Sequence, residues 1–395
     1  MNSHKIIDFE QAKQYVTPRK KSLPEITIMR SLAMLAVVCI HFLNIPVSNI
    51  QTGTAGQGFF FIWRSMLVFA VPSFIFMSML TVSYTANEKL PIFDFYKKKL
   101  LRVGIPYIVW SIGYLLILLI VGHYTLSEIL NPKSVFYFLA YGKSYEHLYF
   151  MPILLEFFLI TPLLLPIARK VKNSPVAAIA IAFGVQIIIY FLNKNIFYPH
   201  FKMLSSTFLW YFSIGFLGLW FGCNYHKNFE FVKKHSAKIF VLLAVVGIIH
   251  RYYSRLLWQQ LWNVVSFNTF LHTLNLHLYM LLCTLLLLLI ANWFCEYPRN
   301  AKGQEKKVHR FLLWANPLSY GIYLMHPVFM YLLRKIFELP PLQIRLPILW
   351  AAVILLGVPS IAWLCGKITA FFENIPIIRL AFGNPAFPKK NKKAV

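Results

Sequence analysis

The sequence predicts an all-α polytopic membrane protein with about ten transmembrane helices and both termini on the cytoplasmic side. Hydrophobic residues make up 58% of the 395 residues and charged residues only 13%, which is too little charge to cover a water-soluble globule. Several apolar runs reach the roughly 20 residues that cross a bilayer core. The net charge of +26 is spread unevenly along the chain, and this unevenness gives the orientation. The composition excludes a disordered chain, a disulfide scaffold and a secreted soluble enzyme.

Ten apolar runs account for most of the chain, and each has about the length that a membrane helix needs. The seventh run is the weakest of the ten, because Arg251 and Arg255 lie at or just beyond its end. A further apolar stretch, 135–140, is too short to cross, so we expect it to lie along the membrane surface or to re-enter. The ten runs are residues 26–46, 59–83, 103–122, 147–168, 175–192, 205–222, 237–253, 268–292, 313–333 and 346–370.

The basic residues gather on one side of this ten-helix arrangement. Of the 39 Lys and Arg residues, 28 lie in the N-terminal tail, the even-numbered connections and the C-terminal part. The odd-numbered connections hold nine when basic residues at the span ends are counted with the adjoining connection, and the remaining two, Arg30 and Arg64, lie within predicted spans. Because cytoplasmic loops of membrane proteins collect Lys and Arg, the basic side is predicted to be cytoplasmic. The bilayer is therefore the expected partner of this charge, and nucleic acid is not.

The predicted helices leave little chain outside the membrane. We expect a cytoplasmic N-terminal tail over 1–25, a ten-helix transmembrane domain over 26–372, and a basic cytoplasmic tail over 373–395. The first 25 residues are polar and basic, so no cleavable signal peptide is predicted. The five cysteines show no CxxC spacing and lie mostly in apolar runs, so a metal site is not expected.

The first predicted span contains two ionisable residues, Arg30 and His41. A titratable residue in a span is costly and is therefore a functional candidate. The eleven-residue separation is about three helical turns, so both side chains share one face and lie roughly 16 Å apart along the axis. With the N-terminus inside, Arg30 lies toward the cytoplasm and His41 toward the outer half. The alternative is a snorkelling Arg and a His bonded to a neighbouring helix.

A basic segment, residues 97–102, comes just before the third span and is followed by Pro106, Tyr107 and Trp110. Cations at a cytoplasmic mouth can bind the phosphates of an anionic cofactor. The same pattern is expected of a topology determinant attracted to anionic lipid, so the spacing leaves both interpretations open.

Three further polar residues are predicted to support catalysis. Glu156 lies in the middle of the fourth span, where it is placed to orient a histidine or to form an ion pair with Arg64. Tyr323 and His326 lie one helical turn apart in the ninth span, which is also compatible with ordinary packing. The chain has no GxSxG, HExxH, P-loop or GxGxxG motif. An enzyme of this sequence would therefore depend on histidine or on bound-cofactor chemistry.

Four segments of the chain resemble motifs of the membrane acyltransferase type 3 family. One is the pair Arg30 and His41 with ten residues between them, and another is the late pair Tyr323 and His326. The other two are the second-span stretch 71–79 and the basic segment before the third span, where the matching residues are Lys99, Arg102, Pro106, Tyr107 and Trp110.

The resemblance covers nearly the whole chain and departs from the family pattern at two positions. Lys99 stands where the family usually has Arg, which keeps the charge but loses the bidentate fork. Met79 stands where family members usually have Gly. With no esterase-like domain in the sequence, the chain is similar to the stand-alone members that act on surface polysaccharides, including the intercellular-adhesin type.

The resemblance implies an O-acyltransferase in a bacterial plasma membrane. Acyl-CoA would be the donor substrate, with its phosphates at Arg30, Lys99 and Arg102, and no metal would take part. His41 would act as general base toward a hydroxyl of a cell-surface or exported carbohydrate. The acyl group would be of acetyl or succinyl type.

Two other functions remain open at this point. In the same subgroup export has been proposed, so the chain is alternatively an exporter of a surface polysaccharide or small molecule. A third interpretation is a non-catalytic membrane partner of a polysaccharide synthesis machinery.

Overall fold

The computed structural model describes residues 23–86, 90–263, 265–298, 305–337, 347–375 and 378–384. Within these ranges the chain forms helices and loops, and no β-strand is present. Eight helical segments are long and apolar enough to cross a membrane, which confirms the predicted all-α polytopic class. They are Pro24–Asn49, Ala55–Thr85, Ile92–Ile120, Phe150–Lys170, Pro175–Phe197, Ser236–Gln259, Thr269–Glu296 and Leu349–Phe372.

The two remaining predicted spans are also helical. The sixth corresponds to the 3-10 turn η4 (Phe208–Tyr211) and the helix α11 (Phe212–Cys223), which together are shorter than the eight. The ninth corresponds to α15 (Lys307–Phe337). In α11 the residues from Phe212 to Gly222 are all buried, so this helix lies inside the bundle.

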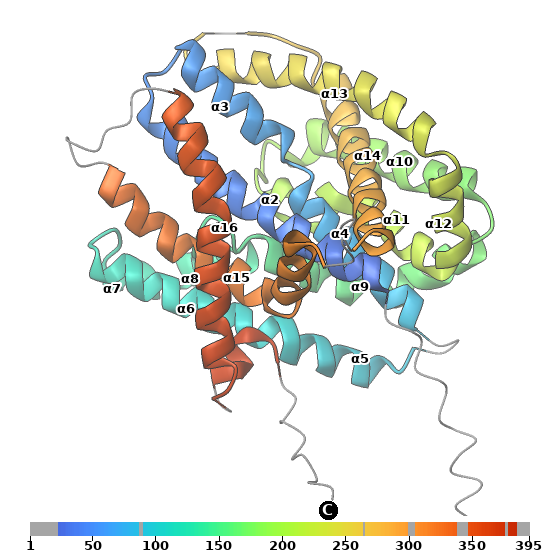
Figure 1. Ribbon diagram of the computed structural model, residues 1–395, viewed down its shortest axis with the longest axis horizontal. Coiled ribbons are helices and arrows are strands. Elements are labelled where there is room, and N and C mark those ends of the chain that lie inside the picture. The colour runs from blue at the N-terminus through green and yellow to red at the C-terminus, as the bar shows by residue number, and fades with distance from the viewer. Residues whose placement is uncertain are drawn as a thin grey trace, which may run out of the picture.

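Helix α2 (Pro24–Asn49) lies near the centre of the bundle (Figure 1). It contacts α3, α4, α14, α15 and α16. The helices around it and further out are α3 (Ala55–Met66), α4 (Ala70–Thr85), α5 (Ile92–Lys99), α6 (Ile105–Ile120), α9 (Phe150–Lys170), α10 (Pro175–Leu192), α12 (Tyr225–Lys234), α13 (Ser236–Gln259), α14 (Thr269–Glu296) and α16 (Pro347–Phe372).

The helices α4 and α11 approach each other closely because α11 carries glycines where they meet. A Cβ atom added at Gly218 would lie 2.5 Å from the carbonyl oxygen of Phe76, and one at Gly222 would lie 2.2 Å from that of Leu80. Neither distance is possible for a real side chain, so only glycine allows this contact. This close packing fixes the position of α4 against α11.

The second predicted span is broken in its middle, between α3 and α4. Residues Leu67 to Phe69 form a turn, and Pro72 follows just inside α4. Proline has no N–H to donate, and its ring clashes with the carbonyl group four residues earlier, so the helix is interrupted before it. At the break the carbonyl of Ser65 accepts a long backbone bond of 3.4 Å from Val68 and a shorter one of 3.0 Å from Nε2 of His250.

A second irregularity occurs where the third span begins. Residues Leu100–Gly104 form a π-helical turn, η1, between α5 and α6. Pro106 explains it, because its ring excludes the regular bond to the carbonyl of Arg102. The turn places Arg102 on a widened part of the helix, which is a feature that recurs at functional sites.

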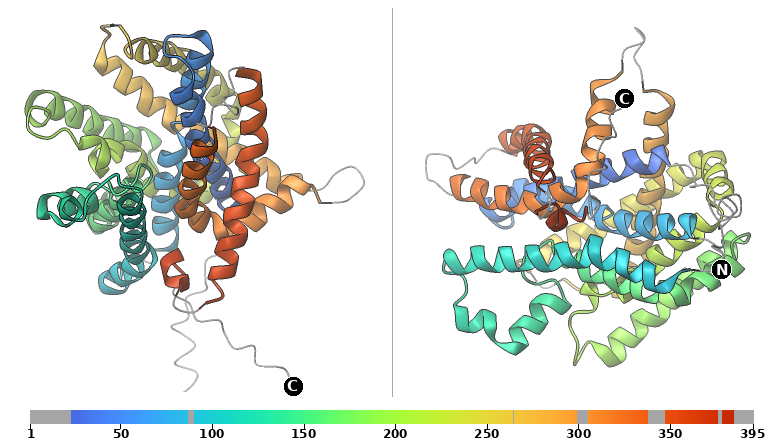
Figure 2. Two further views of the ribbon diagram at one scale, coloured as in Figure 1. Left: turned by 90° about the vertical axis from the view of Figure 1, so that its left-hand side faces the viewer. Right: turned by 90° about the horizontal axis from the view of Figure 1, so that it is seen from below.

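Outside the spans, α7 (Leu126–Leu130) and α8 (Pro132–Ala140) form a hairpin at the edge of the bundle (Figure 2). The hydroxyl of Tyr107 in α6 donates to the carbonyl oxygens of Phe138 at 3.1 Å and Leu139 at 2.7 Å. The stretch 135–140 is therefore a short helix held against α6, which agrees with the expectation that it does not span.

Part of the segment predicted as a basic tail is packed against the bundle. The short helix η6 (Ile378–Phe382) contacts α6, where the indole Nε1 of Trp110 donates to the carbonyl of Ala381 at 2.9 Å. Phe382 is buried against the rings of Trp110 and Phe372, which explains why this segment leaves the solvent. Gly383 follows with a φ of 71° and passes close to the carbonyl of Arg102.

Candidate active site formed by two adjoining cavities

The three residues predicted to bind the cofactor line one cavity of about 330 Å³, which we call the basic cavity. Arg30 comes from α2, Lys99 from the end of α5 and Arg102 from the π-helical turn. None of the residues lining it is acidic. Three cations without a carboxylate in their cavity make a site suited to an anionic ligand.

Local contacts hold the cations of the basic cavity in place. Nη1 of Arg30 donates to Oδ1 of Asn316 in α15 at 3.3 Å. The Nζ atom of Lys99 lies 4.1 Å from the centre of the Phe158 ring, a cation–π contact that keeps the ammonium group directed inward. Both partners are uncharged, so the positive charges are not neutralised by these contacts.

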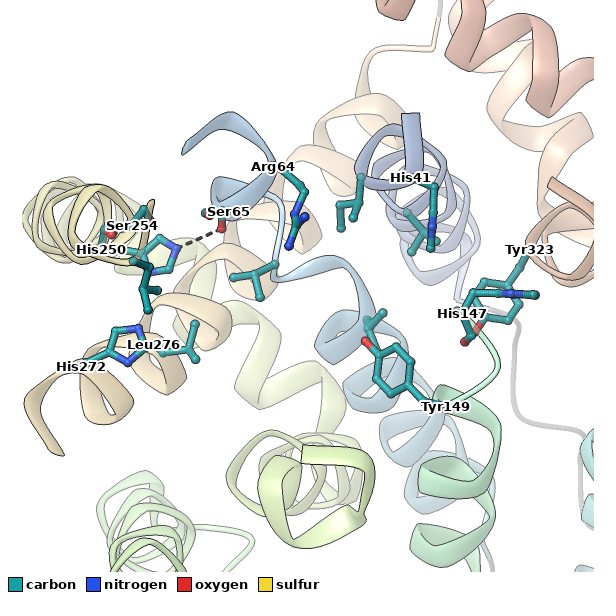
Figure 3. Close-up of a pocket in the computed structure, with 15 residues that line it drawn as sticks. His41, Arg64, Ser65, His147, Tyr149, His250, Ser254, His272, Leu276 and Tyr323 are labelled. Carbon is teal, nitrogen blue, oxygen red and sulfur yellow. Dashed lines mark hydrogen bonds between the residues drawn. The ribbon is translucent and has the colours of Figure 1, made fainter. Parts of the chain in front are cut away.

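The second cavity, which we call the histidine cavity, also has a volume of about 330 Å³ and is shown in Figure 3. Its lining includes His41 from α2, Arg64 and Ser65 from the end of α3, and His147 and Tyr149 from the connection before α9. The far wall is formed by α13 and α14, with His250, Ser254, His272 and Leu276. The broken span brings Arg64 to this cavity, because α3 ends two residues after it.

Three imidazole rings lie together beside the histidine cavity, and two of them, His41 and His147, line it. The ring centres of His41 and His326 are 5.0 Å apart, those of His147 and His326 are 5.5 Å apart, and those of His41 and His147 are 6.3 Å apart. Among the described residues, no set of three or more His, Cys, Asp or Glu side chains is arranged to hold a metal ion. Imidazole nitrogens donate and accept protons near neutral pH, so such a cluster can support acid–base chemistry.

His147 belongs to this cluster, although no sequence pattern indicated a role for it. It lies at the very start of the fourth predicted span, where placing a titratable residue costs little free energy. Its presence there therefore does not indicate a functional site. In the structure it is 1% exposed, and neither ring nitrogen has a hydrogen-bond partner among the described residues. Burial, with His326 and His41 nearby, lowers the pKa of His147 well below its usual range.

The tautomer of His326 follows from its surroundings. Its Nδ1 lies 3.1 Å from the carbonyl oxygen of Ile322, and a carbonyl oxygen only accepts, so Nδ1 carries the hydrogen. Nε2 is buried without a partner among the described residues and is left as an acceptor. His326 thus presents a basic nitrogen in the cluster that contains His41.

Tyr323 separates the two cavities and lines both of them. Its hydroxyl donates to the backbone carbonyl of His147, which ties α15 to the connection before α9. Its ring centre lies 5.2 Å from that of His147 and 6.0 Å from that of His326. The predicted pair of Tyr323 and His326 is therefore brought beside His41, and Tyr323 is the common wall.

On its other side His41 lines a smaller pocket of about 80 Å³. Glu146, Asn44, Tyr145 and Arg334 also line this pocket. The Oε2 atom of Glu146 lies 3.9 Å from Nδ1 of His41, and the glutamate side chain is 68% exposed. Glu146 is thus the acidic residue beside His41, and the sequence did not indicate it because it lies in a connection.

The predicted pairing of Glu156 with Arg64 is wrong. The Glu156 carboxylate accepts a hydrogen bond at 2.6 Å from the backbone N–H of Phe208, at the start of η4. Arg64 instead donates from Nη1 to Oδ1 of Asn44 at 3.0 Å. Glu156 is absent from the linings of the three cavities described above, because capping a helical turn occupies it elsewhere in the bundle.

Comparisons with known proteins identify the family of the chain. Residues 23–367 match the family model described as an acyltransferase domain. A relative from Staphylococcus epidermidis, described as a probable poly-beta-1,6-N-acetyl-D-glucosamine export protein, is 26% identical over 321 residues, which cover 78% of this chain and 81% of the relative. The protein of the same description from strain RP62A of that species gives the same values. No solved structure matches the chain.

The family match includes every segment that forms the two cavities. It begins before Arg30 and ends beyond His326, and it takes in the broken second span and the π-helical turn. Because the model covers most of the chain, the protein is a multi-pass member of the membrane acyltransferase type 3 family.

Proposed function

We propose that the protein is an O-acyltransferase of a bacterial plasma membrane that moves an acyl group from cytoplasmic acyl-CoA to a hydroxyl of a cell-surface carbohydrate. The observation that carries this proposal is the position of Tyr323, which lines both the basic cavity and the histidine cavity. An anion-binding site and a cluster of proton acceptors are thereby separated by one side chain. This is the arrangement that transfer from an anionic donor to a neutral hydroxyl requires.

The donor would bind through the basic cavity. The phosphates of acyl-CoA carry several negative charges, and Arg30, Lys99 and Arg102 line one cavity without a competing acid. Charge-assisted hydrogen bonds from guanidinium and ammonium groups are about twice as strong as neutral ones. With its phosphates held there, the pantetheine arm would direct the thioester toward Tyr323 and the histidine cluster.

The transfer step would use His41 as general base. Its imidazole takes the proton from the acceptor hydroxyl as the hydroxyl oxygen attacks the thioester carbonyl carbon. The new C–O bond forms, the C–S bond breaks, and the CoA thiolate leaves and takes the proton from His41. Glu146 stabilises the imidazolium form of His41 between these two events.

Tyr323 and His326 would assist as positioning residues. His326 offers an acceptor nitrogen beside His41, and the centres of the two rings are 5.0 Å apart. This arrangement favours one orientation of the base. Tyr323 holds the backbone of His147 and shapes the passage between the cavities. Glu156, which caps η4, would act only through the fold.

Export is the second candidate, and the description of the Staphylococcus epidermidis relative as a probable export protein favours it. In that case the two cavities would be parts of a permeation path and the basic residues would guide an anionic solute. A non-catalytic partner of polysaccharide synthesis machinery would need neither cavity.

One variant distinguishes these functions. In a host carrying only the His41→Ala protein, transfer predicts loss of ester groups from the surface polymer while polymer still reaches the surface. Export predicts loss of the polymer itself, and a scaffold predicts no change. His123→Ala is the matched control, because His123 is exposed in the connection after α6. Loss of polymer together with its esters would refute the proposed transfer.

A further inference from the structure

We propose that the histidine cavity contains a carboxylate-binding site built on Arg64, so that one of the two substrates carries a carboxylate. The inference rests on the proposed transfer reaction and names a chemical class for the group that it handles. The two possible sources are an acyl group with a terminal carboxylate and an acidic sugar in the acceptor. Both present the same chemistry to Arg64.

Arg64 is held at the end of α3 with its guanidinium group directed into the histidine cavity (Figure 3). Nη1 donates to Oδ1 of Asn44 at 3.0 Å, and the guanidinium carbon lies 5.6 Å from the centre of the Phe61 ring. A guanidinium group has five N–H donors, so these contacts leave most of its capacity unused.

No acidic residue lines the histidine cavity, and Arg64 forms no ion pair within 4.0 Å in the part of the chain that the structure describes. The carboxylate of Glu146 acts on Arg64 from the adjoining pocket, but it is 68% exposed, so water screens most of this attraction and the guanidinium keeps room for a second anion inside the cavity. The other groups of the lining are imidazoles, hydroxyls and apolar side chains, including Val68, Leu257 and Leu276. A cation in such surroundings is costly unless an anion pairs with it. The cavity therefore favours an anionic ligand next to Arg64.

The form of the site favours a carboxylate over a phosphate. The planar fork of a single arginine matches both oxygens of one carboxylate and balances its single charge. The basic cavity, with three cations, is by contrast suited to phosphates. Since Arg64 and His41 line the same cavity, a carboxylate held by Arg64 belongs to a group close to the base.

Binding of matched ligands to the purified full-length protein in lipid nanodiscs tests the proposal. Succinyl-CoA and butyryl-CoA have acyl chains of the same length and differ by a carboxylate in place of a methyl group. Cellobiouronic acid and cellobiose provide the same contrast for the acceptor. The variants are Arg64→Gln, which removes the charge, and Arg64→Lys, which keeps the charge and loses the fork. Arg251→Gln is the control, because Arg251 is exposed on α13.

We expect the wild type and Arg251→Gln to bind succinyl-CoA about tenfold more tightly than butyryl-CoA. In Arg64→Gln this ratio falls to about one while the affinity for butyryl-CoA changes less than about twofold, and Arg64→Lys gives an intermediate ratio. Retained butyryl-CoA affinity shows that the variant is folded. If Arg64→Gln does not fold, the intermediate ratio of Arg64→Lys carries the test.

Each alternative outcome decides a different point. If the two donors bind equally but cellobiouronic acid binds more tightly than cellobiose in an Arg64-dependent manner, the carboxylate belongs to the acceptor and the site stands. If neither pair shows an Arg64-dependent difference, the proposed site is overturned. If neither CoA compound binds the wild type, the proposed transferase function fails, and the two disaccharides still decide the carboxylate site.

Discussion

The hydroxyl of Tyr323 donates a hydrogen bond to the backbone carbonyl of His147, so the residue of α15 that lines both cavities also holds the loop before α9. Both residues are buried, and neither ring nitrogen of His147 has a partner among the described residues. The bond to its backbone and the surrounding rings of Tyr114, Tyr145 and His326 together hold the His147 imidazole in place.

Replacing Tyr323 by Phe removes the hydroxyl and leaves the His147 carbonyl buried without this donor. An unsatisfied buried carbonyl costs about 1–3 kcal/mol, so the loop is expected to shift and kcat for acyl transfer to fall about tenfold. KM for acyl-CoA should change less than about twofold, because the cations of the basic cavity are untouched. Initial rates with the purified protein measure both values.

Tyr96→Phe is the control for this variant. Tyr96, on α5, lines neither cavity, and its hydroxyl donates to the carbonyl oxygen of Leu159 at 2.9 Å. Its loss should leave kcat within about twofold. Equal effects of the two substitutions would show that the bond to His147 has no specific role.

Arg102→Gln is expected to weaken acyl-CoA binding by about tenfold or more, since it removes one charge-assisted contact to phosphate. Calorimetric titration of the purified protein measures the affinity. Arg310→Gln is the control, because Arg310 is exposed on α15. An unchanged affinity in Arg102→Gln would refute the assignment of the basic cavity to the cofactor.

Glu146→Gln is expected to lower kcat about threefold. The carboxylate lies 3.9 Å from Nδ1 of His41, but it is 68% exposed, so water screens most of its interaction with the imidazolium form. Steady-state rates at saturating donor detect the change. Glu230→Gln, which affects only a surface pair with Lys233, should leave the rate unchanged. A rate loss of a hundredfold or more in Glu146→Gln would assign this carboxylate a direct part in catalysis.

Gly222→Ala is expected to destabilise the bundle by about 1–3 kcal/mol, because the added Cβ collides with the carbonyl of Leu80. Thermal unfolding in detergent measures this loss as a lower transition temperature. Gly184→Ala in α10 is the control, since its Cβ would meet nothing within 4 Å, and alanine favours a helix by up to about 1 kcal/mol. A Gly222→Ala protein as stable as the wild type would mean that α4 and α11 can separate without cost.

The sequence predicted the fold class and the approximate positions of the helices, because hydrophobic length is a direct physical requirement of the bilayer. It also predicted that Arg30, Lys99 and Arg102 would lie together, since two short motifs place them near the same membrane surface. The roles of these residues remain predictions. The features of the site that the sequence pattern did not predict are those that depend on where the helices break.

The break between α3 and α4 is one such feature. Pro72 explains it after the fact, yet prolines also occur inside intact helices of this chain, such as Pro162 in α9. Which proline interrupts a helix depends on whether neighbours satisfy the freed carbonyls, as His250 does for Ser65. His147 and Glu146 were missed for a related reason, because a connection is brought to the centre of the site only by tertiary packing.

The position of Tyr323 between the two cavities has a consequence for how the membrane voltage acts on the substrate. The distribution of Lys and Arg predicts that the basic cavity faces the cytoplasm. If water fills the two cavities from opposite faces of the bilayer, Tyr323 would lie in a thin insulating layer between them. The membrane voltage then falls mostly across that layer. Moving one charge through the full voltage is worth about 2.3 kcal/mol per 100 mV. An acyl group bearing a carboxylate would do nearly all of this work in passing Tyr323, so its transfer would respond to the energised state of the cell, whereas that of a neutral acyl group would not.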